Sequence, residues 1–77
     1  VDMLNNATVG ALFTREIRDR GMTIRAVSEK TGIPYSHLQT SLKGTREMRA
    51  DEFLKLCVQL EINPMTVITE TVKEVPA

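Results

Sequence analysis

The chain has 77 residues, which suffice for one compact core but not for two domains. Hydrophobic residues make up 42% and charged residues 26%, a globular composition that excludes disordered and fibrous chains. One cysteine, Cys57, and one histidine, His37, exclude an internal disulfide and a Cys/His zinc site. We therefore expect a single domain over residues 1–77, with its core at about residues 7–72 and no metal or other cofactor.

The net charge is zero, but the charges are unevenly distributed along the chain. Residues 14–49 contain eight basic and four acidic side chains, a net charge of +4, whereas residues 50–77 carry −3. Duplex DNA binding depends on Lys and Arg that neutralise phosphates, so the basic stretch is compatible with a nucleic-acid partner. No apolar stretch approaches the roughly 18 to 20 residues of a membrane span, and the N-terminus lacks a signal-peptide layout. We expect a cytoplasmic protein without a membrane partner.

Two helices are predicted before residue 32. The first covers about residues 7–20 and ends at Gly21, and Gly10 is expected to weaken its early turn slightly. Thr23 is a good N-cap for the second helix, over about residues 24–31, which Gly32 stops. Apolar or small residues at helical spacing mark the inward faces: Val9, Leu12, Phe13 and Ile17 in the first helix and Ile24, Val27 and Ser28 in the second.

A third helix is expected from Pro34 to about Lys43-Gly44, because proline is tolerated in a first helical turn. Leu38 and Leu42 face inward in it. A polar loop over residues 44–49 follows, with Met48 as its apolar anchor.

Two apolar helices complete the predicted fold. The fourth covers about residues 50–60, with Asp51 and Glu52 in a first turn that favours acidic groups. The fifth opens with Asn63 as N-cap and Pro64 as the first helical residue, and continues until Pro76. No segment alternates apolar and polar residues as a strand does, so the fold class is all-α.

The second and third helices, joined across Thr31-Gly32-Ile33, predict a helix-turn-helix over about residues 23–43, with Gly32 supplying the positive φ of the turn. The chain resembles the lambda-repressor-like helix-turn-helix family, the phage repressor and Cro type, over about residues 9–68. The resemblance is carried by MTIRAVSEKTGI at residues 22–33, Leu38, Lys43-Gly44, FLKLC at 53–57 and LEINP at 60–64. It implies a compact five-helix domain.

Four residues depart from the family pattern. Ser28 stands where alanine is usual, and Pro34 replaces a common serine. Ser41 occupies a position that is usually apolar, and we expect Leu42 to take over its packing with a slight rotation of the third helix. Ile24 replaces a glutamine that helps to hold the DNA backbone.

The resemblance implies that the third helix enters the major groove while the second crosses the phosphates. The outward residues of the third helix are then the predicted base contacts: Tyr35, Ser36, Gln39 and Thr40. Gln39 is the strongest candidate, because its amide can donate and accept bidentately to adenine, and Thr40 is suited to a thymine methyl group. Tyr35 is bulky for this position, and stacking on sugar or phosphate is its alternative role.

The predicted contacts to the DNA backbone are Thr23, Arg25, Lys43, Arg46 and Arg49. About five neutralised phosphates per protomer predict a slope of about −4 to −5 in log K against log salt. The alternative for the three arginines is weak surface pairing with Glu29, Glu47 or Asp51. His37 is expected at the surface or near a phosphate, and Cys57 in the core.

The stripe Ile68, Val72 and Val75 either completes the core or forms a dimer contact. We favour a homodimer, because two recognition helices related by a two-fold axis match a palindromic site. The leading hypothesis is the DNA-binding domain of a transcriptional repressor of phage, prophage or plasmid origin that binds a double-stranded operator.

Two other functions fit the same fold. One is an autoregulatory antitoxin whose acidic C-terminal segment binds a toxin. The other is a protein-interaction module without DNA binding, which the zero net charge and Ile24 favour. An enzyme is not expected, because the sequence shows no catalytic constellation.

Overall fold

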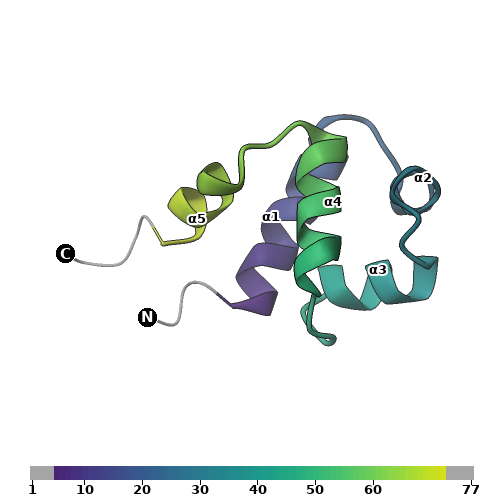
Figure 1. The fold of residues 1–77 in the computed structure, drawn as a ribbon, viewed down its shortest axis with the longest axis horizontal. Coiled ribbons are helices and arrows are strands. Elements are labelled where there is room, and N and C mark those ends of the chain that lie inside the picture. The colour runs from purple at the N-terminus through teal and green to yellow at the C-terminus, as the bar shows by residue number, and fades with distance from the viewer. Residues whose placement is uncertain (1–4, 73–77) are drawn as a thin grey trace.

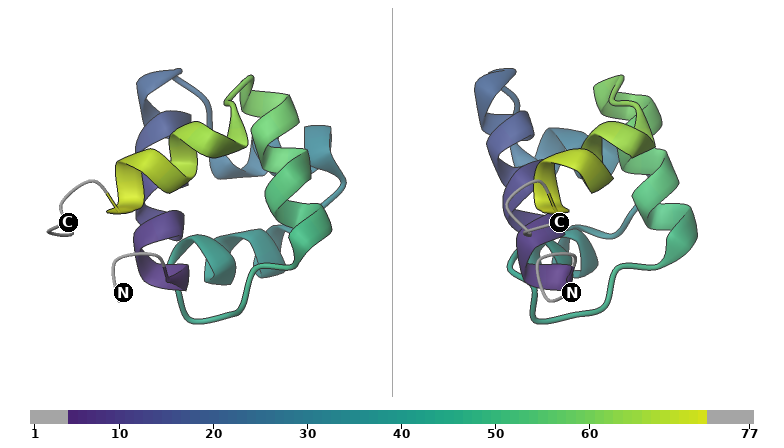
Figure 2. Two further views of the ribbon diagram at one scale, coloured as in Figure 1. Left: turned by 60° about the vertical axis from the view of Figure 1, so that its left-hand side comes forward. Right: turned by 90° about the vertical axis from the view of Figure 1, so that its left-hand side faces the viewer.

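The computed structural model describes residues 5–72. It contains, in chain order, the helices α1 (Asn6–Asp19), α2 (Ile24–Thr31), α3 (Tyr35–Leu42), α4 (Ala50–Leu60) and α5 (Pro64–Val72), and no strand within those residues. Figure 1 shows α5 on one side of α1 and α4, and α2 and α3 on the other. The two further views show α5 crossing between α1 and α4 (Figure 2). The all-α prediction is confirmed.

The helix boundaries agree with the predictions to within one residue at all five starts and depend on local caps. α2 and α4 begin and end as predicted. α1 begins at Asn6, because the Asn5 side chain accepts the Thr8 N–H at 2.9 Å and so caps the helix. In α5 the Asn63 side chain accepts the Met65 N–H at 2.9 Å, as predicted for an N-cap. The predicted continuation of α5 to Pro76 lies outside the described residues.

The prediction that α3 begins at Pro34 was wrong by one residue. Pro34 is the N-cap, with an extended ψ of 138°, and Tyr35 is the first helical residue. The helix ends at Leu42, with Lys43 as its C-cap. Tyr35 therefore lies at the very start of α3, next to the turn that leads from α2.

One aliphatic core joins the five helices. Phe13 of α1 meets Phe53 of α4 edge-to-face, with 5.7 Å between ring centroids. Cys57 is buried, and burial raises the pKa of its thiol, as expected for a core cysteine. The buried apolar side chains are Leu12, Phe13, Ile17, Val27, Ile33, Leu38, Leu42, Leu56, Cys57, Leu60 and Val67.

Gly10 has a packing role that its sequence position did not predict. A Cβ at residue 10 would lie 2.9 Å from the Ser41 carbonyl oxygen and closer still to that of Leu42. The absence of a side chain therefore lets α1 approach the C-terminal end of α3. This contact fixes one end of α3 against the core.

The turn between α2 and α3 combines a glycine with a serine hydroxyl. Gly32 ends α2 in the left-handed region, with φ of 79°. The Ser28 hydroxyl donates to the Ile33 carbonyl oxygen at 2.6 Å. Ser28 stands where alanine is usual in the family that the sequence resembles. Its half-buried hydroxyl group has a hydrogen-bond partner, because it donates to a carbonyl oxygen of the turn.

Leu42 is buried, as expected for the residue that takes over the packing beside Ser41, and Ser41 is buried as well. Ser41 is 2% exposed and Leu42 is 5% exposed. The Ser41 hydroxyl accepts a hydrogen bond of 2.8 Å from Arg46, so a polar group is satisfied at a buried position. α3 therefore uses three inward residues, Leu38, Ser41 and Leu42.

Candidate nucleic-acid interface

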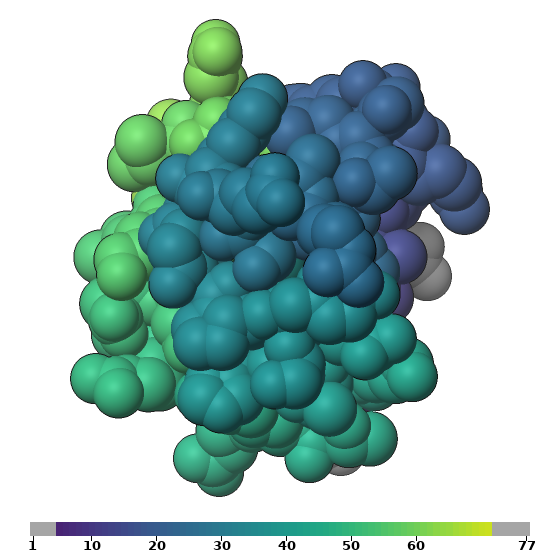
Figure 3. Space-filling view, turned by 90° about the vertical axis from the view of Figure 1, so that its right-hand side faces the viewer, coloured from purple at the N-terminus to yellow at the C-terminus, as the bar shows by residue number. Residues whose placement is uncertain are grey.

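The outward face of α3 carries polar side chains at helical spacing. Leu38, Ser41 and Leu42 point into the core, which leaves Ser36, Thr40 and Lys43 at the centre of the opposite face. By the same rotation Gln39 and Tyr35 lie toward one flank of this face, and His37 lies toward the other. Figure 3 shows the side of the molecule on which α2 and α3 lie, and both helices are at the surface there.

Side chains that could read bases are unbonded on this face. Within residues 5–72 the side chains of Ser36, Gln39 and His37 form no hydrogen bond or ion pair. Gln39 is half-buried and Ser36 is exposed. Free amide and hydroxyl groups at helical spacing are the groups that recognise base edges in the major groove.

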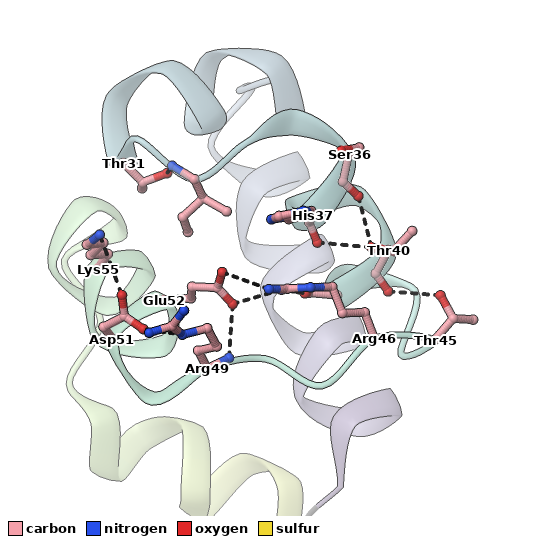
Figure 4. A network of polar contacts seen from close by, with 12 residues as sticks. Thr31, Ser36, His37, Thr40, Thr45, Arg46, Arg49, Asp51, Glu52 and Lys55 are labelled. Carbon is pink, nitrogen blue, oxygen red and sulfur yellow. Dashed lines mark hydrogen bonds and ion pairs between the residues drawn. The ribbon is translucent and has the colours of Figure 1, made fainter.

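The Thr40 hydroxyl is bonded within the protein. It donates to the backbone carbonyl of Ser36 at 2.9 Å or His37 at 3.2 Å, as Figure 4 shows. Thr45 donates to the Thr40 carbonyl through both its backbone N–H and its hydroxyl, each at 3.1 Å. These bonds attach the loop after α3 to the last turn of the helix. A thymine-methyl contact from Thr40 does not require its hydroxyl.

Tyr35 contacts α2. The guanidinium carbon of Arg25 lies over the Tyr35 ring, 4.4 Å from the ring centroid. This separation is typical of a cation–π pair. Tyr35 is half-buried and Arg25 is exposed, so the stack lies at the surface where the first turns of α2 and α3 meet.

The basic side chains of the described region fall into two groups. Six take part in ion pairs: Arg15, Arg18, Arg20, Arg46, Arg49 and Lys55. The three without an ion-pair partner in residues 5–72 are Arg25, Lys30 and Lys43, and all three belong to α2 or the end of α3. Glu29, the pairing partner considered for Arg25, forms no ion pair with it. Although the net charge is zero, positive charge without an internal counter-ion gathers on the helix-turn-helix.

The Arg46 side chain forms hydrogen bonds to Glu52 and Ser41, which the sequence did not predict. Its two terminal nitrogens donate to the Glu52 carboxylate at 2.9 and 3.3 Å, and one of them also donates to Ser41. Glu52 is buried and also accepts the Arg49 N–H at 2.9 Å (Figure 4). The hydrogen bond from Arg46 is the main cause that lowers the pKa of Glu52, against the opposing effect of burial. This Arg46–Glu52 pair connects the loop after α3 to the start of α4.

The other predicted backbone contacts are at the surface. Arg49 pairs with Asp51 at 3.3 Å, and Lys55 lies 3.7 Å from the same carboxylate (Figure 4). The Thr23 hydroxyl caps α2 by accepting the Ala26 N–H at 3.1 Å. The Ile24 and Arg25 N–H groups in the first turn of α2 have no carbonyl partner in the described chain, as is usual at a helix N-terminus. Such groups suit a phosphate oxygen.

Of the three residues predicted at a dimer contact, only Ile68 has a described side chain. It is 38% exposed on α5, near Met65, which is more exposed. Val72 ends α5 and Val75 lies outside the described residues. Val67 and Thr71 are the buried residues of this helix.

Metal sites and membrane spans are not found in the described region. Residues 5–72 contain no group of three His, Cys, Asp or Glu side chains that could bind a metal ion. The same residues contain no helix with the length and apolar character of a membrane span. The candidate site is the polar face of α3, with the cations Arg25, Lys30 and Lys43 on or beside the helix-turn-helix.

Five helices with a left-handed glycine between α2 and an exposed, polar α3 define a helix-turn-helix DNA-binding domain. Residues 14–71 match the family of Cro/C1-type HTH DNA-binding domains, and the chain belongs to this family. No curated protein and no solved structure matches the chain. Its partner is double-stranded DNA and its general role is transcription regulation.

Proposed function

We propose that the chain is the DNA-binding domain of a phage- or prophage-type transcriptional repressor that binds a palindromic operator as a homodimer. The observation that carries the proposal is the outward face of α3, where unbonded Ser36 and Gln39 lie beside Lys43. Base edges are recognised by such side chains, while cations and helix N-termini fix the register on the phosphates. A repressor then acts by occupying the operator and excluding polymerase.

The proposed contacts follow from placing the outward face of α3 in the major groove of the operator. Ser36, Gln39 and Thr40 contact bases, and Tyr35 lies at the edge of the same surface. Arg25, Lys43, Arg49 and the start of α2 at Thr23 contact phosphates. Arg46 belongs to the same proposed set, and it also makes three hydrogen bonds within the protein.

The proposed dimer contact is on α5. Ile68 and Met65 are exposed apolar side chains of this helix. The helix itself lies on the side of the molecule opposite α2 and α3 (Figure 1). A self-complementary contact there leaves both recognition helices free, and a two-fold dimer matches a palindromic site. The expected salt slope is about −8 to −10 for two protomers.

The test is selection of bound sequences from a random duplex pool at near-physiological salt, with the molecular mass in solution measured in parallel. Enrichment of a palindrome by a dimer is the expected result. Binding that is weak, salt-sensitive and without sequence enrichment would contradict the operator proposal. Absence of any DNA binding would favour a protein-interaction module, and capture of a toxin chain by the wild-type domain would favour an antitoxin.

A further inference from the structure

The stack of Arg25 on Tyr35 joins the two helices of the helix-turn-helix at their first turns. Arg25 is the second residue of α2 and Tyr35 is the first residue of α3. The guanidinium carbon lies 4.4 Å from the ring centroid. No acidic side chain in residues 5–72 bonds to Arg25, so the aromatic ring is the group that restrains its charged end.

This contact leaves the hydrogen-bonding capacity of Arg25 unused. A cation–π contact depends on the charge of the guanidinium group and does not pair its N–H donors with an oxygen or nitrogen acceptor. None of these donors has an acceptor in the described chain. The planar donor set matches two oxygens of a phosphate, and the free N–H groups at the start of α2 lie on the same turn.

Tyr35 is placed beside the reading face rather than at its centre. Successive α-helical residues differ by about 100°, which puts Ser36, Thr40 and Lys43 opposite the buried Leu38 and Ser41. Tyr35 is rotated from that centre toward α2, and its ring is covered by Arg25. Arg25 therefore occupies one face of this half-buried ring.

We propose that Tyr35 is a positioning residue that holds the Arg25 guanidinium for a DNA phosphate and does not itself read a base. The inference rests on the proposed DNA binding and assigns sequence reading to Ser36, Gln39 and Thr40. Immobilising a long side chain in advance removes an ordering cost of about 0.5 to 1.5 kcal/mol on binding, which corresponds to roughly two- to tenfold in affinity. The contribution is independent of DNA sequence, because phosphate contacts carry no direct sequence information.

The test is a double-mutant cycle with Tyr35→Ala, Arg25→Ala and both changes together, and with Tyr35→Phe as the matched control that keeps the ring. Affinity is measured for the selected operator, for single-base variants of it and for an unrelated duplex, at several salt concentrations. Thermal unfolding shows that each variant is folded at the temperature used.

Tyr35→Phe should bind as the wild type does. Tyr35→Ala should weaken binding to every duplex by roughly two- to tenfold and leave the ranking of base variants unchanged. Arg25→Ala should reduce the salt slope by about 0.9 per protomer, and adding Tyr35→Ala to it should cause no further loss. Upfield shifts of the Arg25 δ-methylene protons in the free protein, absent in Tyr35→Ala, should report the stack directly.

Two results would overturn the inference while leaving DNA binding intact. One is a change in base preference in Tyr35→Phe or Tyr35→Ala. The other is a double mutant whose fold-loss in affinity is the product of the two single fold-losses. Such a result would mean that the two residues contribute to binding independently. A wild-type protein that binds no duplex would instead show that the proposed function is wrong, together with this inference.

Discussion

Arg46 bonds both carboxylate oxygens of Glu52, at 2.9 and 3.3 Å, across the loop that joins α3 to α4. The same carboxylate accepts the Arg49 N–H in the manner of an N-terminal cap of α4. The Arg46 guanidinium group also donates to the buried hydroxyl of Ser41 in the last turn of α3. Arg46 and Glu52 therefore link the last turn of α3 to the start of α4.

Glu52→Gln tests the contribution of this pair to stability through its pH dependence. A lowered pKa means that the stabilising effect of Glu52 is fully present above its ordinary value near 4.5 and is lost as the pH falls through the lower value of the folded state. At about pH 7 the free energy of unfolding should fall by about 1 to 3 kcal/mol. Glu16, whose pKa is lowered by Arg20, titrates in both proteins and cancels in the comparison.

The measurement is urea unfolding of both proteins at about pH 7 and about pH 3, where the two should approach the same stability. A difference that stays constant with pH would mean that the charge of Glu52 makes no net contribution. The amide of Gln would then differ from the carboxylate in packing alone.

Arg46→Ala and Arg49→Ala should separate an internal role from a surface role. Arg46→Ala leaves the buried Glu52 without its main partner, and we expect a loss of about 2 to 4 kcal/mol. The Arg46 side chain is 28% exposed, which favours the lower end of that range. Arg49→Ala breaks an exposed pair with Asp51 and should change stability by less than about 0.5 kcal/mol. Thermal unfolding checks both, and equal stability of the two variants would contradict the internal role.

Much of the fold could be predicted from the sequence because its signals are local. Helical spacing, the caps Thr23 and Asn63, and Gly32 determine where the helices begin and end. The relationships that were missed are contacts between residues that are separated in the sequence and close in the fold. Gly10 could be judged only as a weak helix former until its contact with the Leu42 carbonyl was known.

The candidate site was predicted in outline for the same reason. Inward Leu38 and Leu42 imply which residues of α3 face outward, so Ser36, Gln39 and Lys43 follow from the period of the helix. The period of the helix does not indicate which basic side chains form ion pairs. A list of basic residues cannot distinguish Arg46, which is bonded to Glu52, from Lys43, which has no ion-pair partner in the described residues.

Gly10→Ala distinguishes helix propensity from packing. Propensity alone predicts that alanine stabilises α1 by about 1 kcal/mol. The structure predicts the opposite sign, a loss of about 1 to 3 kcal/mol, because the added Cβ would meet the Ser41 and Leu42 carbonyl groups. Chemical denaturation measures the change. The matched control is Ala11→Gly at the neighbouring exposed position, which should cost about 1 kcal/mol from propensity. A stabilised Gly10→Ala protein would show that the two helices are not in close contact.

Gln39→Ala tests base reading. Its amide has no partner in the described chain, so truncation should leave the fold unchanged within about 0.5 kcal/mol. Discrimination between the preferred base and its alternatives at one operator position should fall by about 1 to 3 kcal/mol, with little change in binding to unrelated duplexes. Competition titrations with single-base variants measure this. A uniform loss on all sequences would assign Gln39 to the phosphates instead.

Lys43→Gln tests whether the cations without ion pairs are the ones that meet phosphates. Lys43 is exposed at the end of α3, whereas Lys55 on α4 pairs with Asp51 at 3.7 Å. Lys43→Gln should weaken binding to every duplex and reduce the slope of log K against log salt by about 0.9 per protomer, because one fewer phosphate is neutralised. Lys55→Gln is the charge-matched control and should leave the slope unchanged. Binding isotherms across a salt series compare the two, and equal slopes would place Lys43 outside the DNA contact and α3 in another orientation.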